Sequence, residues 1–285
     1  MTTINLPPNK IAANSDADSK LFIEAFGELE EFSNRYIKEM LKIGGYPAAY
    51  PWPVDNLHNW SRWWEYAFVW LNLKRLVAKK KTIRVLDIGS GLTFFPFFLA
   101  DKGFEVTTID IDARIKKWAE AALVKQKPGF VTGDVTKTKF NSHSFDVITN
   151  ISVIEHVDNK VGAIVEMYRL LQPDGMIVNT LDISLDGLPI GDSQPLRVRE
   201  AHEFIGVLEK TFNTKIAFEF VHPMDILTPA KYPKRFTDGS LYISKRHLMR
   251  QLWKLLSSRL SARFVFNPHR LDMWTVMGVT ARKKK

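Results

Sequence analysis

The feature that most constrains this fold is a short apolar run that ends in two closely spaced glycines. Residues 85–88 read Val-Leu-Asp-Ile, and Gly89-Ser90-Gly91 follow at once. A run of this length suits a buried strand, and the glycines let the chain turn sharply with no Cβ in the way. Residues 92–102 have the composition of a helix, and Gly103 is expected to end that helix. The segment predicts a strand, a tight turn and a helix.

The same alternation of strand and helix continues along the chain at intervals of about 20–30 residues, which is typical of a parallel sheet with helices on both faces. The predicted strands are residues 82–88, 104–109, 129–132, 145–150, 176–181, 215–221 and 273–281. We therefore expect an α/β, doubly wound, seven-stranded sheet, mostly parallel with an antiparallel last strand between the fifth and sixth.

An N-terminal helical cover is expected before this sheet. Apolar residues recur at helical spacing over 19–43, and a second helix over 59–78 is rich in tryptophan. The cover would span residues 1–80 and the catalytic domain residues 81–285. Within that domain, residues 222–272 form a basic insertion before the last strand.

Composition excludes several classes. The chain has 285 residues, 45% hydrophobic and 25% charged, with no cysteine, so a disulfide framework, a thiolate zinc site and a thiol nucleophile are ruled out. No metal site is predicted. The N-terminus has no apolar core of a secretory signal, and the longest apolar stretch, 92–100, is too short to span a bilayer. We expect a soluble, cytoplasmic protein.

The net charge of +9 is concentrated near the C-terminus. Residues 231–285 hold 14 Lys/Arg and 2 Asp/Glu, a local charge of +12, so the rest of the chain is slightly acidic. Any electrostatic partner should therefore meet the C-terminal fifth of the chain.

Carboxylates follow the next two predicted strands. Asp110 ends the second strand, 19 residues after Gly91, where an acid accepts hydrogen bonds from both ribose hydroxyls of an adenosine. Asp134, in Gly133-Asp134-Val135 after the third strand, can receive an adenine amino group. Phe94 stands where a dinucleotide dehydrogenase has a small residue. These residues favour an adenosine ligand other than a nicotinamide dinucleotide.

Five blocks between residues 84 and 182 resemble, in order, the motifs of class I S-adenosylmethionine-dependent methyltransferases. The blocks are 85–100, 107–110, 133–135, 145–157 and 170–175. The resemblance implies that S-adenosylmethionine is the cofactor. It further implies a set of binding residues: Asp87, Gly89, Ser90 and Gly91 for the methionine end, Thr93 for its carboxylate, Asp110 and Ile111 for the ribose, Asp134 and Val135 for the adenine, and Asn150 or Ile151 near the amino group and sulfonium.

Several residues have both a functional and a purely structural interpretation. His156 is the candidate general base, or part of a helix start common in this family. His222 and Asp225 follow the sixth predicted strand. They either lie at the carboxyl edge of the sheet, as His156 does, or are solvated loop residues. Arg62 is a candidate ligand of the cofactor carboxylate. The aromatic residues around it, Trp52, Trp60, Trp63, Trp64, Tyr66 and Trp70, form a lid in one interpretation. In the interpretation that we favour, Trp60, Trp63, Trp64 and Trp70 pack the cover against the sheet at helical spacing.

The predicted function is methyl transfer to a small-molecule or saccharide-like acceptor, with oxygen favoured. Residues 245–256 form a basic amphipathic pattern that would receive an anionic or lipid-linked acceptor, or contact an anionic membrane surface as a peripheral protein; a solvated helix is the alternative. Nucleic acid is disfavoured, because the fourth strand lacks the Pro-Pro-aromatic run of base methylases. The rival functions are a nicotinamide-dependent oxidoreductase and a catalytically idle scaffold.

Overall fold

The computed structural model describes residues 9–47, 50, 52–77, 82–120, 125–188, 195–231, 233, 235–236 and 273–284. The strands are β1 (Lys10–Ile11), β2 (Arg84–Ile88), β3 (Glu105–Asp110), β4 (Gly129–Thr132), β5 (Phe145–Ile151), β6 (Leu171–Ser184), β7 (Leu196–Arg197) and β8 (Trp274–Arg282). The helices are α1 (Lys20–Lys42), α2 (Arg62–Val77), α3 (Phe95–Asp101), α4 (Ala113–Glu120), α5 (Lys160–Leu170) and α6 (Val198–Phe212).

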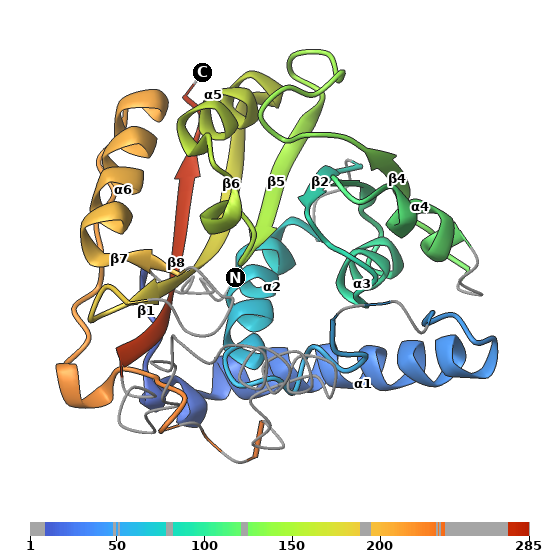
Figure 1. The fold of residues 1–285 in the computed structure, drawn as a ribbon, viewed down its shortest axis with the longest axis horizontal. Coiled ribbons are helices and arrows are strands. Elements are labelled where there is room, and N and C mark those ends of the chain that lie inside the picture. Colours follow the sequence, from blue (N-terminus) through green and yellow to red (C-terminus); the bar gives the residue numbers. More distant parts are fainter. Residues whose placement is uncertain are drawn as a thin grey trace, which may run out of the picture.

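The strands form one sheet in the order β1-β8-β6-β5-β2-β3-β4, with β7 paired to β6 (Figure 1). β2, β3, β4, β5 and β6 run parallel, whereas β8 pairs antiparallel with both β6 and β1. The expected α/β, doubly wound, mostly parallel sheet with an antiparallel last strand is confirmed. The parallel strands bring their carboxyl ends to one edge, where ligands of such sheets bind.

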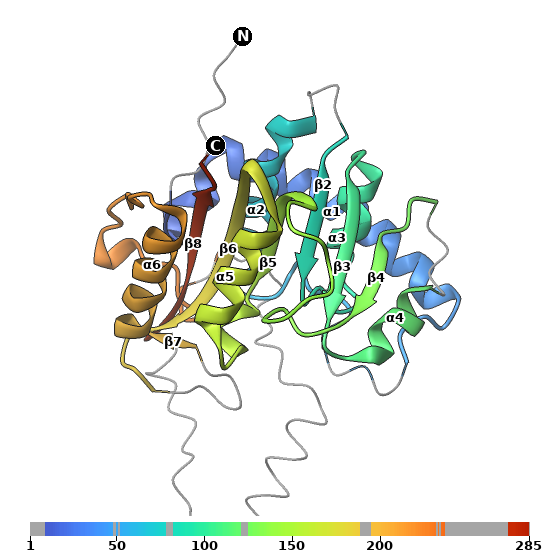
Figure 2. The ribbon, with the colours of Figure 1, turned by 90° about the horizontal axis from the view of Figure 1, so that it is seen from above.

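The helices lie on both faces of the sheet (Figure 2). α1, α2 and α3 cover one face, and α5 and α6 cover the other. On the first face, one apolar cluster joins side chains of all three helices to inward residues of β2, β5, β6 and β8. A second cluster joins the other face to α5 and α6. Gly278 of β8 is needed for the first contact, because a Cβ there would lie 2.6 Å from the ring of Phe68 on α2.

The sixth predicted strand, residues 215–221, does not form. Only one bridge, between Asn9 and Phe218, and one backbone hydrogen bond from Glu219 to Asn9 (2.8 Å) are made there. β1 instead fills the place beside β8, so the outer hydrogen bonds of β8 are already taken. Phe220 is consequently 81% exposed. A two-residue strand has no periodicity for a sequence reading to detect.

The N-terminal cover forms as helices α1 and α2, close to their predicted limits. The division into residues 1–80 and 81–285 stays a prediction, and the basic amphipathic segment 245–256 lies outside the described residues. Within the part of the chain that the structure describes, no helix is both long and apolar enough to cross a membrane.

Candidate functional site

The turn after β2 has the backbone geometry that the two glycines predicted. Gly89 and Gly91 adopt φ angles of +65° and +55°, in the left-handed region that side chains disfavour. A Cβ on Gly89 would lie 2.5 Å from Cγ1 of Val153, so the turn is pressed against the loop after β5. Between the glycines, the buried Ser90 hydroxyl has no hydrogen-bond partner.

Asp110 lies beside this turn at the end of β3. Its carboxylate accepts hydrogen bonds from the backbone N–H of Gly91 (3.2 Å) and of Asp112 (2.9 Å). Burial raises the pKa of Asp110, and the backbone donors partly offset that rise. The next side chain, Ile111, is 79% exposed and offers an apolar surface next to the carboxylate.

The third predicted block lies next to Asp110, because the Gly133 N–H donates to the Asp110 carbonyl (3.0 Å). Asp134 is exposed and accepts hydrogen bonds from the N–H and the hydroxyl of Thr136, both at 2.8 Å, while Val135 is buried. This arrangement fits an adenosine-containing ligand. It combines the glycine turn, the unpartnered Ser90 hydroxyl and the carboxylates of Asp110 and Asp134 at adjacent strand ends.

Asp87 is buried within β2, and the Thr149 hydroxyl of β5 donates to it (2.6 Å). Burial raises the pKa of Asp87 to about 7, and Thr149 opposes part of that rise. Asn150, on the opposite face, accepts a hydrogen bond from the Ile154 N–H (3.1 Å) and so holds the loop after β5. Ile151 is half-buried in the apolar cluster.

Arg62 does not stand alone at the start of α2. Its guanidinium donates to both carboxylate oxygens of Glu65, each at 2.7 Å, and 23% of its side chain remains exposed. Glu65 is fully buried and also accepts from the hydroxyls of Ser152 (2.5 Å) and Thr180 (2.7 Å). The start of α2 is thereby tied to the carboxyl ends of β5 and β6.

Two more carboxylates, Asp182 and Glu155, adjoin this pair. The Asp182 N–H donates to Glu155 Oε1 (3.0 Å), and the Ser152 hydroxyl lies 3.5 Å from Asp182 Oδ1. Burial raises the pKa of Asp182 to about 7, and burial together with the charge of Asp182 raises that of Glu155. We call Arg62, Glu65, Glu155 and Asp182 the carboxylate cluster.

His156 lies at the surface of the same region. Desolvation, with the charges of Arg62 and Lys160, lowers the pKa of its imidazole. His222 accepts a hydrogen bond from the Met224 N–H (3.2 Å), and Asp225 from the Ser15 hydroxyl (2.5 Å). His222 therefore stabilises its own loop, and Asp225 binds the N-terminal segment at Ser15. The catalytic role of His156 stays a prediction.

Four tryptophans of the aromatic run pack the cover, as favoured, whereas Trp52 is 60% exposed. Trp60, Trp63, Trp64 and Trp70 are each no more than 5% exposed. Tyr50 has another position: its hydroxyl accepts a hydrogen bond from the Leu92 N–H (3.1 Å), and a Cβ on Gly91 would lie 3.4 Å from it. The segment before α2 therefore reaches the glycine turn. Thr93 is also contacted from the cover, through a hydrogen bond with Tyr66.

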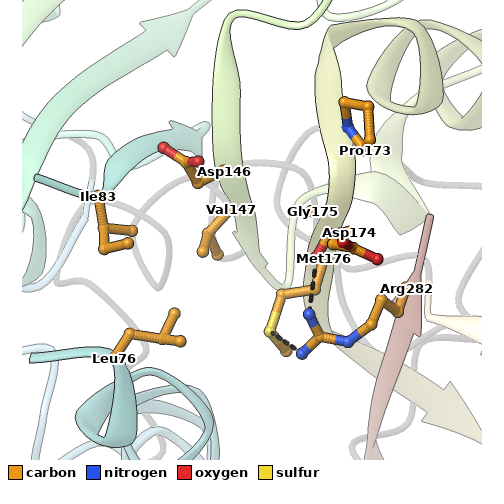
Figure 3. Close-up of a pocket in the computed structure, with 9 residues that line it drawn as sticks. All are labelled: Leu76, Ile83, Asp146, Val147, Pro173, Asp174, Gly175, Met176 and Arg282. Carbon is orange, nitrogen blue, oxygen red and sulfur yellow. Dashed lines mark hydrogen bonds between the residues drawn. The ribbon is translucent and has the colours of Figure 1, made fainter. Parts of the chain in front are cut away.

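A cavity of about 270 Å³ opens at the other end of the sheet (Figure 3). Its walls come from the starts of β5 and β6, including Asp146 and Gly175, and from the end of β8. Arg282 closes one side by donating to the Asp174 carbonyl (2.7 Å). Because this cavity lies at the amino ends of the strands, it is separate from the glycine turn.

Comparison with known proteins agrees with this geometry. Residues 86–179 match the family model of a methyltransferase domain. The chain contains a class I methyltransferase domain. S-adenosylmethionine is the cofactor of this superfamily. The matched residues include the glycine turn, Asp110 and the carboxyl end of β5, whereas Arg62, Glu65, Thr180 and Asp182 lie outside the match.

The similar curated proteins match only part of this chain. Malonyl-[acyl-carrier protein] O-methyltransferase of Enterobacter lignolyticus is 31% identical over 41% of this chain and 45% of its own length. Demethylmenaquinone methyltransferase of Leptospira interrogans is 31% identical over 45% of this chain and 55% of its own. The chain thus spans about half the length of these relatives. The solved structure of the [4+2]-cyclase SpnF (TM-score 0.52, 18% identity, covering 88% of this chain and 95% of that one) shows the same fold.

Sequence reasoning found the glycine turn and the strand-end acids but missed Ser152, Thr180 and Asp182. A signal existed for Asp182, a lone acid between Leu181 and Ile183 in an apolar strand. Ser152 has a φ of +49°, which no sequence pattern indicates for serine. The assignments to individual parts of the cofactor remain predictions.

Proposed function

We propose that this chain transfers a methyl group from S-adenosylmethionine to a small-molecule or saccharide-like acceptor, with oxygen as the favoured accepting atom. The observation that carries the proposal is the glycine turn after β2 with Asp110 beside it at the end of the neighbouring strand. The donor supplies an activated methyl group on a sulfonium. The protein has to align the acceptor with it, and such positioning lowers a barrier by roughly 7–11 kcal/mol.

The residues of the chain have distinct tasks in this proposal. Gly89 and Gly91 leave room for the methionine end, Asp110 accepts from the ribose hydroxyls, and Asp134 accepts from the adenine amino group. Ile111 packs against the adenosine. At the carboxyl end of β5, the loop of Ser152 and Val153 is held against the turn and borders the acceptor side.

The nature of the acceptor is argued from two observations. One partly similar protein is named an O-methyltransferase, which supports oxygen as the accepting atom. The charge of +12 over residues 231–285 supports an anionic or lipid-linked acceptor and contact with an anionic surface through residues 245–256. Methyl transfer to glucose 6-phosphate that is no more sensitive to salt than transfer to glucose would contradict the electrostatic part.

Donor binding to the Asp110→Ala variant tests the proposed function. Loss of the charged acceptor should weaken S-adenosylmethionine binding roughly 10–100-fold, because hydrogen bonds to charged groups contribute about 1.5–3 kcal/mol. Isothermal titration calorimetry measures the affinity. Asp112→Ala is the matched control: Asp112 is paired with Arg114 on the outer side (2.6 Å), so its loss should leave binding unchanged.

Two results would refute the function. One is binding of NADH by the unaltered protein in preference to S-adenosylmethionine. The other is donor affinity that is the same in Asp110→Ala as in the unaltered protein.

A further inference from the structure

The carboxylate cluster holds more negative charge than its protein neighbours balance. Three buried carboxylates, Glu65, Glu155 and Asp182, share the single guanidinium of Arg62. Buried carboxylates are costly unless they are paired or protonated. With all three ionised the cluster would carry a net charge of −2, so without a cationic ligand it either holds a proton or leaves a buried carboxylate unpaired.

No surrounding element supplies the missing positive charge among the described residues. From α2 come Arg62 and Glu65, from the loop after β5 come Ser152, Glu155 and His156, and from β6 come Thr180 and Asp182. The groups that face Glu65 and Asp182, other than Arg62, are hydroxyls or acids. His156 is exposed, and Lys160 is half-buried with its ammonium donating to the Val157 carbonyl (2.9 Å), so neither is among the hydrogen-bond partners of Glu65 or Asp182.

An unused acceptor atom points to a ligand here. Glu155 is 4% exposed, its Oε1 accepts from the Asp182 N–H, and its Oε2 has no hydrogen-bond partner. A buried carboxylate oxygen without a partner is uncommon. A metal ion is disfavoured as the partner, because no group of three or more His, Asp or Glu in the described part of the chain has an arrangement that holds one.

The cluster adjoins the glycine turn. Ser152, which binds Glu65, directly precedes Val153, the residue pressed against Gly89. Tyr66, one residue after Glu65, hydrogen-bonds Thr93 in the turn and feels the charges of both Asp87 and Glu65. The carboxylate cluster and the glycine turn are therefore joined through the loop after β5 and the start of α2.

We propose that a cationic group of the bound ligand completes the carboxylate cluster, and that its entry displaces a proton that Asp182 and Glu155 share when no ligand is bound. The proposal rests on the proposed function, whose donor carries a sulfonium cation. The proton leaves a carboxyl group and passes to solvent, and the carboxylate that remains faces the cation. After methyl transfer the sulfur is neutral, so the cluster takes up a proton again and holds the product less tightly.

Calorimetry with two ligands tests this without an acceptor. S-adenosylmethionine and S-adenosylhomocysteine differ by one methyl group and one positive charge. At pH 7, titration in phosphate, HEPES and Tris should give a binding enthalpy that depends on the buffer for S-adenosylmethionine, with release of up to one proton, and far less dependence for S-adenosylhomocysteine. The affinity for S-adenosylmethionine divided by the affinity for S-adenosylhomocysteine should rise with pH between 6 and 8, by at most about tenfold per pH unit.

Substitution locates the proton. Asp182→Asn should abolish the difference in proton release between the two ligands and lower the affinity ratio, while S-adenosylhomocysteine still binds. Glu155→Gln serves as a second variant and should reduce the same difference. Glu203→Gln is the control, because Glu203 is an exposed partner of Arg199 on α6 and should leave both quantities unchanged.

Each result decides the question. Equal proton release with both ligands, or none with either, would overturn the proposal. The proposed function would still stand in that case, because the donor binds. Unchanged linkage in Asp182→Asn and Glu155→Gln would also overturn it. Absence of donor binding by equilibrium dialysis would remove the proposed function, and this inference with it.

Discussion

At the scale of single residues, the candidate site is built from backbone conformations that most residues avoid. Gly89, Gly91 and Ser152 all have positive φ, and for serine such a conformation is strained by roughly 1–3 kcal/mol. Ser152 is kept there by its N–H, which donates to the Thr180 carbonyl (3.1 Å), and by its hydroxyl bond to Glu65. The strain is sustained by contacts between β5, β6 and α2.

Gly89→Ala should abolish donor binding and destabilise the protein. The new Cβ would meet Val153 at 2.5 Å in a backbone conformation that alanine disfavours, at a cost of roughly 1–3 kcal/mol for the φ angle alone. Thermal unfolding and calorimetry measure both effects. Gly206→Ala in α6 is the control, because a Cβ there meets nothing within 4 Å and should stabilise by about 0.5–1 kcal/mol. Normal donor affinity in Gly89→Ala would contradict the geometry of the turn.

The sequence allowed prediction of site residues that are close together along the chain. Gly89 and Gly91 follow their strand directly, and Asp110 lies at a known spacing. The carboxylate cluster was not predictable in this way, because Glu65 and Thr180 are 115 residues apart and meet only after α2 packs on the sheet.

At the scale of elements, prediction succeeded where the residues of an element show their own pattern. The apolar spacing over 19–43 predicted α1, and the strands β2 to β5 were found within one or two residues. Prediction failed where the pairing of a strand depends on its neighbours in the sheet. Residues 215–221 have strand-forming composition, yet β1 occupies the edge of β8 that they would have joined. Pairing partners are a property of the assembled sheet.

A histidine between two acids fastens the segment before α2 to α1. His58 contacts Asp55 through Nδ1 (2.7 Å) and Glu30 of α1 through Nε2 (2.9 Å), and the hydrogen bond to Asp55, opposed by burial and aided by Glu30, raises its pKa to about 9. A raised pKa means that the folded state binds the proton more tightly. This contribution is therefore complete below pH 6.5 and is lost as pH rises through about 9.

His58→Gln should lower the free energy of unfolding at pH 7 by roughly 1–2 kcal/mol, discounted for the solvent around both acids. Urea unfolding between pH 6 and 10 should show a fall in stability near pH 9 for the unaltered protein and a flatter profile for the variant. His202→Gln, at an exposed position on α6, is the control. Identical profiles for all three proteins would mean that the contacts of His58 contribute no stability.

At the scale of the whole molecule, buried acids set how stability depends on pH. Burial raises the pKa of Asp87 and of Asp182 to about 7, so the folded state holds protons that the unfolded chain releases above its ordinary pKa of 3.8. Between these values stability falls as pH rises, at about 1.4 kcal/mol per unit for each group. Paired acids such as the partly buried Glu166, with its pKa lowered by Arg169, act in the opposite sense below about pH 4.5.

The unliganded protein should therefore be most stable below neutral pH, near pH 5. Thermal melting from pH 4 to 8 measures this, and Asp87→Asn should raise the melting temperature at pH 7 relative to the unaltered protein. Saturating S-adenosylmethionine should reduce the fall in melting temperature between pH 5 and 7, because the ligand binds more tightly when the buried acids of the site are ionised. A maximum at pH 8 in the unliganded protein would show that these acids are ionised without cost.

The location of β8 between β6 and β1 has a consequence for how the chain is made. β8 is the last of the described strands to be synthesised, yet it hydrogen-bonds to Lys10 and Ile11, which form the first of them. Contacts so distant in sequence close slowly. Until β8 has been synthesised, the edge of β6 that it covers and the edge of β1 both lack their strand partner, so the nascent chain exposes strand edges that favour aggregation for as long as β8 is missing.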